Sequence, residues 1–145
     1  MKKNIIDVQT GKFQISEHFA VTHSTTEDEL CAHLKDIPFT KTMNNFIFIS
    51  VQNIVIDTDY LYFVFQFKNN KVQNILFKVN NGPLPSNYKA PESDWGYSED
   101  EMQLFDYQKN WLEQQVGTGK KFIWGKVEAM WQPLSGGAII YLQYK

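Results

Sequence analysis

Residues 98–144 read SEDEMQLFDYQKNWLEQQVGTGKKFIWGKVEAMWQPLSGGAIIYLQY and contain the clearest structural signals of the chain. Ser98 is followed three residues later by Glu101, a capping box in which each side chain bonds a free amide of the first helical turn. Apolar residues then recur at helical spacing, as Phe105, Leu112 and Val116. Gly117 suits a left-handed C-terminal cap. The pattern predicts an amphipathic helix from about Ser98 to about Gly117.

Two segments that follow this helix are rich in β-branched and aromatic residues. Residues 122–127 and 138–144 are predicted strands, and residues 132–137 contain the Pro and Gly residues typical of a turn. Helix and hairpin together would form half of a hydrophobic core.

From Phe46 to Val79 the sequence pattern is strongly of β type. Strands are predicted at residues 46–51, 54–56, 60–67 and 72–79. Leu61, Phe63, Phe65 and Phe67 share one strand face, because side chains alternate along a strand. Asn69 and Asn70 tolerate the positive φ angles of a tight turn, which predicts a hairpin over residues 65–77.

The first forty residues carry weaker signals. One or two short strands are expected between Ile5 and Val21, around the Thr10-Gly11 turn. Thr26 to Glu29 forms a second capping box, and the short helix that follows should end by Ile37, because Pro38 disfavours helical geometry before it.

The predicted fold is a single α+β domain over residues 1–145. It consists mainly of an antiparallel sheet with two helices, the longer one near residues 98–116. Residues 80–97 lack periodicity and contain three of the five prolines, so a long loop is expected there. Loops of this length tend to be functional or mobile, and a linker is the other interpretation.

Composition narrows the class of protein. The hydrophobic fraction is 43% and the aromatic fraction 15%, which argues against disorder. The lone Cys31 favours a reducing compartment, and we expect a cytoplasmic protein with no signal peptide and no membrane span. All 14 basic residues are lysines and the net charge is −2. Without arginine, bidentate recognition of bases or phosphates is disfavoured, so nucleic acid is not an expected partner.

Conventional catalytic and metal motifs fit this chain poorly. Residues 117–121 (GTGKK) lack the first glycine and the Ser or Thr of a phosphate loop, and they end a helix where that loop begins one. Cys31 and His33 point to different sides of a helix. Asp57 and Asp59 are interpreted as a solvated turn. No catalytic residue, metal or cofactor is therefore expected.

The most suggestive stretch runs from Glu92 to Asp106. Acidic and aromatic residues alternate there without a lysine, and the predicted partner-binding residues are Glu92, Asp94, Trp95, Tyr97, Glu99, Asp100 and Glu101. Carboxylates accelerate encounter with a basic protein and rings anchor the complex. In the alternative interpretation, the acids stabilise the positive end of the helix dipole and Trp95 covers the core.

Trp111-Leu112, residues 122–127, residues 136–140 and Tyr144 resemble the C-terminal part of small bacterial immunity proteins of contact-dependent growth inhibition and related polymorphic toxin systems. The likeness covers about the last third of the chain. It implies a non-enzymatic cytoplasmic protein that binds a cognate toxin domain, often a nuclease and here expected to be basic, and neutralises it by occlusion.

Two other classes stay open at this point. In a small-molecule-binding or enzymatic domain, aromatic strands would enclose a pocket into which His18, His23 or a carboxylate projects. A structural or assembly subunit would form a stable homo-oligomer. A deep apolar cavity would favour the pocket, whereas a filled core with an acidic exposed face would favour toxin binding.

Overall fold

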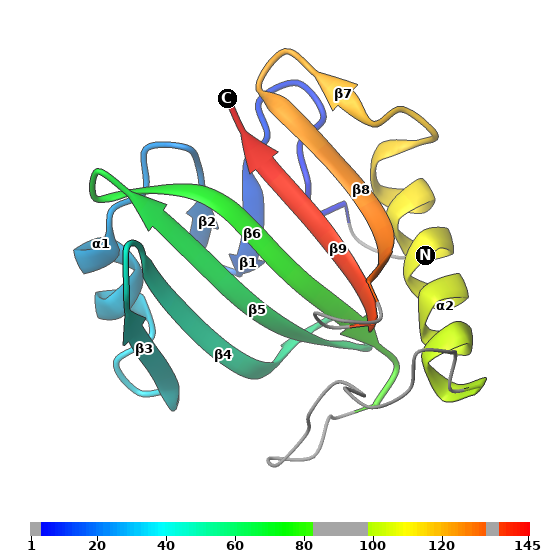
Figure 1. Ribbon diagram of the computed structural model, residues 1–145, viewed down its shortest axis with the longest axis horizontal. Coiled ribbons are helices and arrows are strands. Elements are labelled where there is room, and N and C mark those ends of the chain that lie inside the picture. The colour runs from blue at the N-terminus through cyan, green and yellow to red at the C-terminus, as the bar shows by residue number, and fades with distance from the viewer. Residues whose placement is uncertain (1–3, 83–98, 133–136) are drawn as a thin grey trace.

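The computed structural model describes residues 4–82, 99–132 and 137–145 (Figure 1), and the side chains of residues 99–101 and 132 lie outside this description. The described elements are two helices and nine strands. Their bounds are β1 Phe13–Ser16, β2 Phe19–Val21, α1 Glu27–His33, β3 Phe39–Met43, β4 Ile47–Ile56, β5 Asp59–Lys68, β6 Lys71–Asn80, α2 Glu99–Val116, β7 Lys121–Phe122, β8 Gly125–Gln132 and β9 Gly137–Tyr144.

Seven strands form one sheet in the order β3-β4-β5-β6-β9-β8-β7, and β1 and β2 form a separate hairpin. Every neighbouring pair in the large sheet is antiparallel. The predicted α+β fold, mostly antiparallel sheet with two helices, is confirmed. The last strand β9 inserts between β6 and β8, so the C-terminal hairpin extends the meander.

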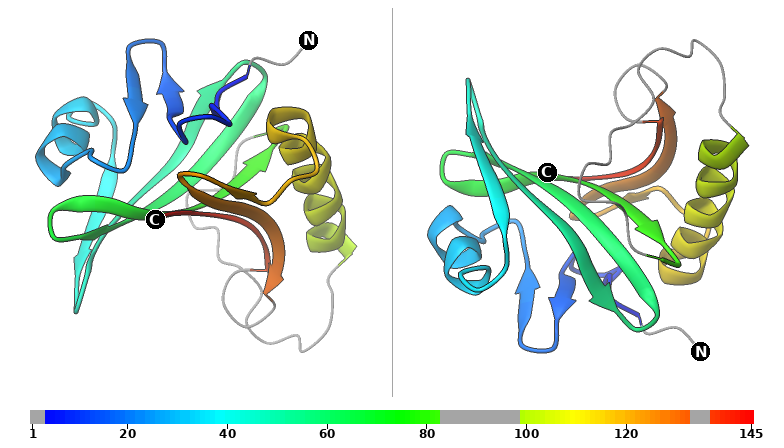
Figure 2. Two further views of the ribbon diagram at one scale, coloured as in Figure 1. Left: turned by 90° about the horizontal axis from the view of Figure 1, so that it is seen from above. Right: turned by 90° about the horizontal axis from the view of Figure 1, so that it is seen from below.

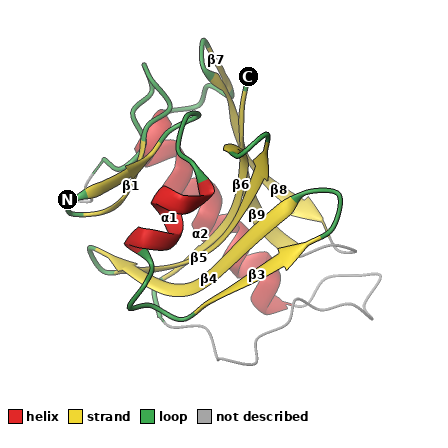
Figure 3. Ribbon diagram, turned by 90° about the vertical axis from the view of Figure 1, so that its left-hand side faces the viewer, coloured by secondary structure: helices red, strands yellow, loops and turns green. Residues whose placement is uncertain are grey.

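The core lies between one face of this sheet and the elements packed on it. Figures 2 and 3 show α1, α2 and the β1–β2 hairpin on the same side of the sheet. The predicted alternation of β5 is confirmed, since Leu61, Phe63, Phe65 and Phe67 are all buried. Phe77 of β6 lies at the centre, with ring centroids 5.0 Å from Phe13 and 5.8 Å from Trp111 of α2.

Both predicted helices are present. Helix α2 ends at Gly117, whose φ is +78° and whose amide donates to the Glu113 carbonyl at 2.9 Å, so residues 117–121 end a helix as predicted. The capping box at α1 is confirmed, with the Glu29 amide donating to Thr26 Oγ1 at 3.2 Å and the Thr26 amide donating to Glu29 Oε1 at 3.2 Å. Ser98 lies outside the described residues, so the α2 capping box is still a prediction.

The predicted hairpin between β5 and β6 is confirmed, and its Asn69 and Asn70 adopt φ of 53° and 63°. The two strands predicted at residues 46–51 and 54–56 are one strand, β4. A bulge between Val51 and Ile54 interrupts its register, and Asn53 there has a φ of 57°. The sequence showed the interruption but not that pairing with β5 continues across it.

The prediction of one strand over residues 122–127 is wrong, because this segment is divided between β7 and β8. The chain turns at Ile123 and Trp124, between β7 and β8. Gly125 has a φ of +154°, and an added Cβ would lie 2.0 Å from the Gln143 carbonyl oxygen of β9. Only glycine permits this approach, which lets the chain reverse and join the sheet.

Strand β3 was not predicted, because its sequence FTKTM has no apolar alternation and most of it is exposed. It exists because its backbone pairs with β4, with Lys41 opposite Ile49. The Lys41 ammonium forms an ion pair with Glu27 of α1, which fastens this edge strand to the helix. The ion pair raises the pKa of Lys41 above its usual value, chiefly through the hydrogen bond to Glu27.

Candidate functional site

Helix α2 carries the only part of the predicted contact stretch that the structure places. One side of it is buried, at Gln108, Trp111, Leu112 and Gln115. The other side is exposed and polar, at Gln103, Asp106, Lys109, Asn110, Glu113 and Gln114. This division follows the amphipathic pattern of the sequence. The helix therefore offers a polar surface whose inner side is fixed in the core.

Three side-chain hydrogen bonds fasten α2 to three separate segments. Gln108 Oε1 accepts from the Val79 amide of β6 at 2.8 Å, and both residues are buried. Gln115 Oε1 accepts from the Ile5 amide at 2.7 Å. The Tyr107 hydroxyl donates to the Asp59 carboxylate at the start of β5. Since these contacts lie at different positions along the helix, they restrict both its rotation and its sliding.

The interpretation of Asp57 and Asp59 as a solvated turn is correct for Asp57 and wrong for Asp59. Asp57 is exposed and turns the chain with a φ of 55°. Asp59, however, is only 3% exposed and accepts the Tyr107 hydroxyl. Asp59 shares the inward face of β5 with Leu61 and Phe63 because side chains alternate along a strand. It acts as a buried anchor for α2.

Replacing Tyr107 by phenylalanine is expected to lower the free energy of unfolding by about 1–3 kcal/mol, because a buried carboxylate loses a hydrogen-bond donor. Urea unfolding followed by circular dichroism would measure this change. Tyr62→Phe on the half-buried outer side of β5 is the matched control, and we expect it to stay within about 0.5 kcal/mol of the native protein. Equal stability of the two variants would contradict the anchoring role of Asp59.

The structure describes only some of the predicted partner-binding residues. Glu99, Asp100 and Glu101 form the first turn of α2, so three acidic residues do lie together at one helix end. Glu92, Asp94, Trp95 and Tyr97 lie outside the described residues. The exposed Asp106 adds a carboxylate farther along the same helix. The first turn of α2 lies at the opposite end of the helix from β7 (Figure 1).

The histidines and the cysteine, considered as pocket or catalytic residues, lie in solvent or in ordinary packing. The His18 side chain is 89% exposed, and His23 is exposed beside the edge of the Tyr144 ring. His33 stacks on Phe19 with ring centroids 4.4 Å apart. Burial raises the pKa of the half-buried Cys31 thiol, which disfavours the reactive thiolate. In the described parts of the chain, no group of three or more His, Cys, Asp or Glu residues is arranged to hold a metal ion.

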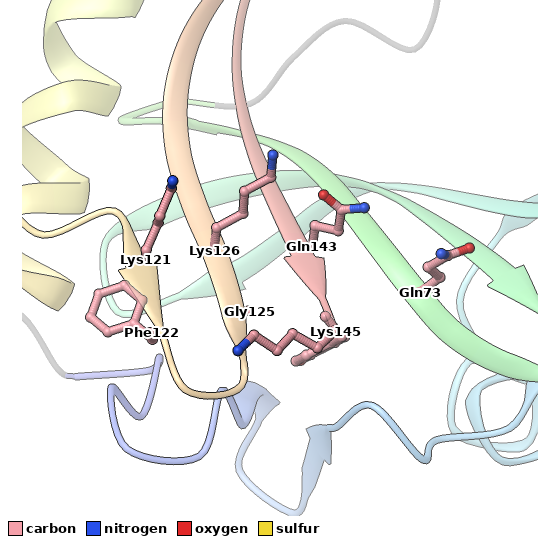
Figure 4. A pocket seen from close by; sticks show the side chains of 8 residues that line it. Gln73, Lys121, Phe122, Gly125, Lys126, Gln143 and Lys145 are labelled. Atoms are coloured by element: carbon pink, nitrogen blue, oxygen red, sulfur yellow. The ribbon is translucent and has the colours of Figure 1, made fainter.

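The β7–β8 end of the sheet has two open hollows that the sequence analysis missed. One of about 440 Å³ is lined by Gln73, Lys121, Phe122, Gly125, Lys126, Gln143, Tyr144 and Lys145 (Figure 4). The other, of about 760 Å³, is lined by Val8, Gln9, Lys121, Phe122, Ile123 and Lys145. In the sequence, these hollows are indicated only by the lysines that flank apolar residues within positions 120–126. Lys145 and Gln73 become part of the hollow only through the fold.

Neither described helix is long and apolar enough to cross a membrane. Comparison of the chain with protein-family models, with curated proteins and with solved structures finds no match.

Proposed function

We propose that this chain is a non-enzymatic bacterial immunity protein that binds a cognate, basic toxin domain and neutralises it by occlusion. The proposed contact surface is the Glu92 to Glu101 stretch, which ends in the acidic first turn of α2. The proposal is based on the resemblance in the last third of the chain and on the way α2 is held.

The observation that carries the proposal is the triple attachment of α2. A binding surface gains affinity when its groups are already ordered, because less conformational entropy is lost on association. The hydrogen bonds to Asp59, Val79 and Ile5 hold the helix at successive positions. A rigid element of this kind suits an inhibitor that works by occlusion. Such an inhibitor acts by covering its target and needs no catalytic side chains.

The packing of the sheet favours this function over the pocket alternative. A small-molecule site would need space among the aromatic strands, yet their inner face is occupied by closely packed rings. Phe13, Phe63 and Phe77 have ring centroids 5.0–6.0 Å apart and are 0% exposed. His18 and His23 project into solvent instead of into this core.

Charge accounts for recognition in this proposal. Glu99, Asp100 and Glu101 follow one another at the helix start, and Asp106 is exposed beyond them. Carboxylates on a protein surface steer a basic partner and raise its association rate. Trp95 and Tyr97, which precede them in the sequence, supply the large rings that commonly anchor a protein interface. The bound protein would then cover the active site of the toxin or a surface beside it.

The direct test is capture of the tagged protein from the bacterium that encodes it, identification of a bound protein, and titration of the purified pair. We expect a basic toxin domain in a one-to-one complex with a Kd near or below about 1 nM, in keeping with tight protein inhibitors. Toxin activity should fall in proportion to the fraction bound. A bound toxin that keeps its full activity, or capture of the chain alone, would contradict neutralisation by occlusion.

A further inference from the structure

We propose that the β7–β8 tip is a second docking surface, and that it takes an acidic polypeptide segment with an apolar side chain at its centre. The lysine tip is defined here as Ile123 together with Lys120, Lys121, Lys126 and Lys145. It lies at the opposite end of α2 from Glu99, and this helix of 18 residues is about 27 Å long at 1.5 Å per residue. The lysine tip is therefore separate from the proposed toxin contact.

The apolar part of the surface centres on Ile123. Ile123 is 88% exposed, more than any other large apolar residue in the described ranges. Single exposed apolar residues are common and need no explanation. Here, however, the half-buried Phe122 and the 41% exposed Val8 line the same hollow of about 760 Å³. An apolar side chain from a partner would find three contacts there.

The tip is fixed in position. The rings of Phe122 and Trp124 stack with centroids 5.2 Å apart and planes within 1°. Trp124 Nε1 donates to the Val8 carbonyl at 2.9 Å, and the Trp124 carbonyl accepts the Lys145 amide at 2.9 Å. The indole also covers Gly11 so closely that an added Cβ there would lie 2.5 Å from the ring. Ile123 is consequently held out by its neighbours and does not depend on a partner for its placement.

The charge at the tip is opposite in sign to that of the whole chain. The net charge of the protein is −2, yet Lys121, Lys126 and Lys145 are the charged residues that line the two hollows. Lys120 Nζ lies 3.8 Å from Glu128 Oε2, and this carboxylate partly neutralises the charge of Lys120. The carboxylate of Asp7 accepts the Gln9 amide at 2.8 Å, and Asp7 lines neither of the two hollows. Three lysines on flexible stems thus favour a carboxylate-rich partner.

The neighbouring amides favour a polypeptide over a lipid surface. Gln73 and Gln143 line the smaller hollow beside Lys126 (Figure 4). Their side chains can donate to and accept from a peptide backbone, and such groups add specificity at protein interfaces. A membrane would require more apolar area than one protruding isoleucine, since interfacial binding scales with buried apolar surface.

The test uses isotope-labelled full-length protein and a panel of glutamate-rich peptides that differ in their central apolar residue, followed by NMR titration. We expect saturable shifts at residues 121–126 and at Lys145. Affinity should fall about tenfold or more in Ile123→Ser and in Lys121→Gln/Lys126→Gln, as for a hot-spot residue and its flanking charges. Val55→Ser is the matched apolar control, because Val55 is 56% exposed on β4. Lys68→Gln/Lys71→Gln at the β5–β6 turn is the charge control.

Three outcomes would overturn the proposal. The first is the lack of saturable binding by any peptide of the panel. The second is equal affinity of the tip variants and the two controls, which would indicate nonspecific attraction. The third is Ile123-dependent sedimentation with phosphatidylserine vesicles in the absence of peptide binding, which would assign the tip to a membrane surface. A lysine-rich peptide with the same apolar centre should not bind.

Discussion

Replacement of Phe77 by alanine is expected to lower the free energy of unfolding by about 3–5 kcal/mol, the usual cost of removing a buried aromatic ring. Phe77 is 0% exposed on β6, and its ring lies 5.0 Å from Phe13, 6.0 Å from Phe63 and 5.8 Å from Trp111. It thus joins the β1–β2 hairpin, the large sheet and α2. The cavity left behind would be lined by three rings that belong to different elements and could not all move together to fill it.

Urea unfolding followed by tryptophan fluorescence would measure this loss of stability. Since domains of this size are stable by only about 5–15 kcal/mol, the variant should unfold at a clearly lower urea concentration. Phe46→Ala is the control, because Phe46 is 39% exposed before β4 and its removal leaves no enclosed cavity. A loss below about 1 kcal/mol for Phe77→Ala would contradict the central position of this ring.

The triple variant Asp94→Lys, Asp100→Lys, Glu101→Lys is expected to abolish protection against the toxin while the protein still folds. Under the proposed function, these carboxylates face basic groups of the toxin, and reversal of their charge replaces attraction by repulsion. Close charge pairs at protein interfaces contribute about 1.5–7 kcal/mol each, so the Kd should rise by about a hundredfold or more. Growth of cells that express the toxin and a Kd titration would both report the change.

The matched control is Glu17→Lys, Asp28→Lys, Asp36→Lys, in which three exposed acids are reversed. It changes the net charge equally and includes one acid in the first turn of α1, so it reproduces the cost of a lysine at a helix start. Circular dichroism of both variants would establish folding. If the first variant retained full binding and protection, the assignment of the contact to the start of α2 would be wrong, even if the toxin itself had been identified.

Part of the candidate site was visible in the sequence and part was not. The acidic start of α2 was predicted, because a run of acids before an apolar helical pattern is a local signal. The attachment of α2 by Gln108 and Gln115 was missed, since glutamines are usually assigned to exposed positions. Their spacing offered a clue, because Gln108 lies four residues after Leu104 and Gln115 four after Trp111. Which backbone amides they would meet depended on β6 and on the segment near Ile5.

The sequence alone determined the features that depend on neighbouring residues. The Thr26 capping box, the glycine cap at Gly117 and the Asn69-Asn70 turn each involve backbone groups only a few positions apart. Alternation along β5 likewise determined which of its faces became buried, because successive side chains must point to opposite sides.

Only the tertiary structure decided the features that depend on distant residues. The polar strand β3 exists through pairing with β4. Residue 125 must be glycine because the Gln143 carbonyl lies where a side chain would be. Asp59 can be buried because the Tyr107 hydroxyl of α2 donates a hydrogen bond to it. Lys145 and Lys121 line the same hollow because β9 pairs with β8. Local patterns cannot specify these contacts, since each requires two segments that become neighbours only when the chain folds.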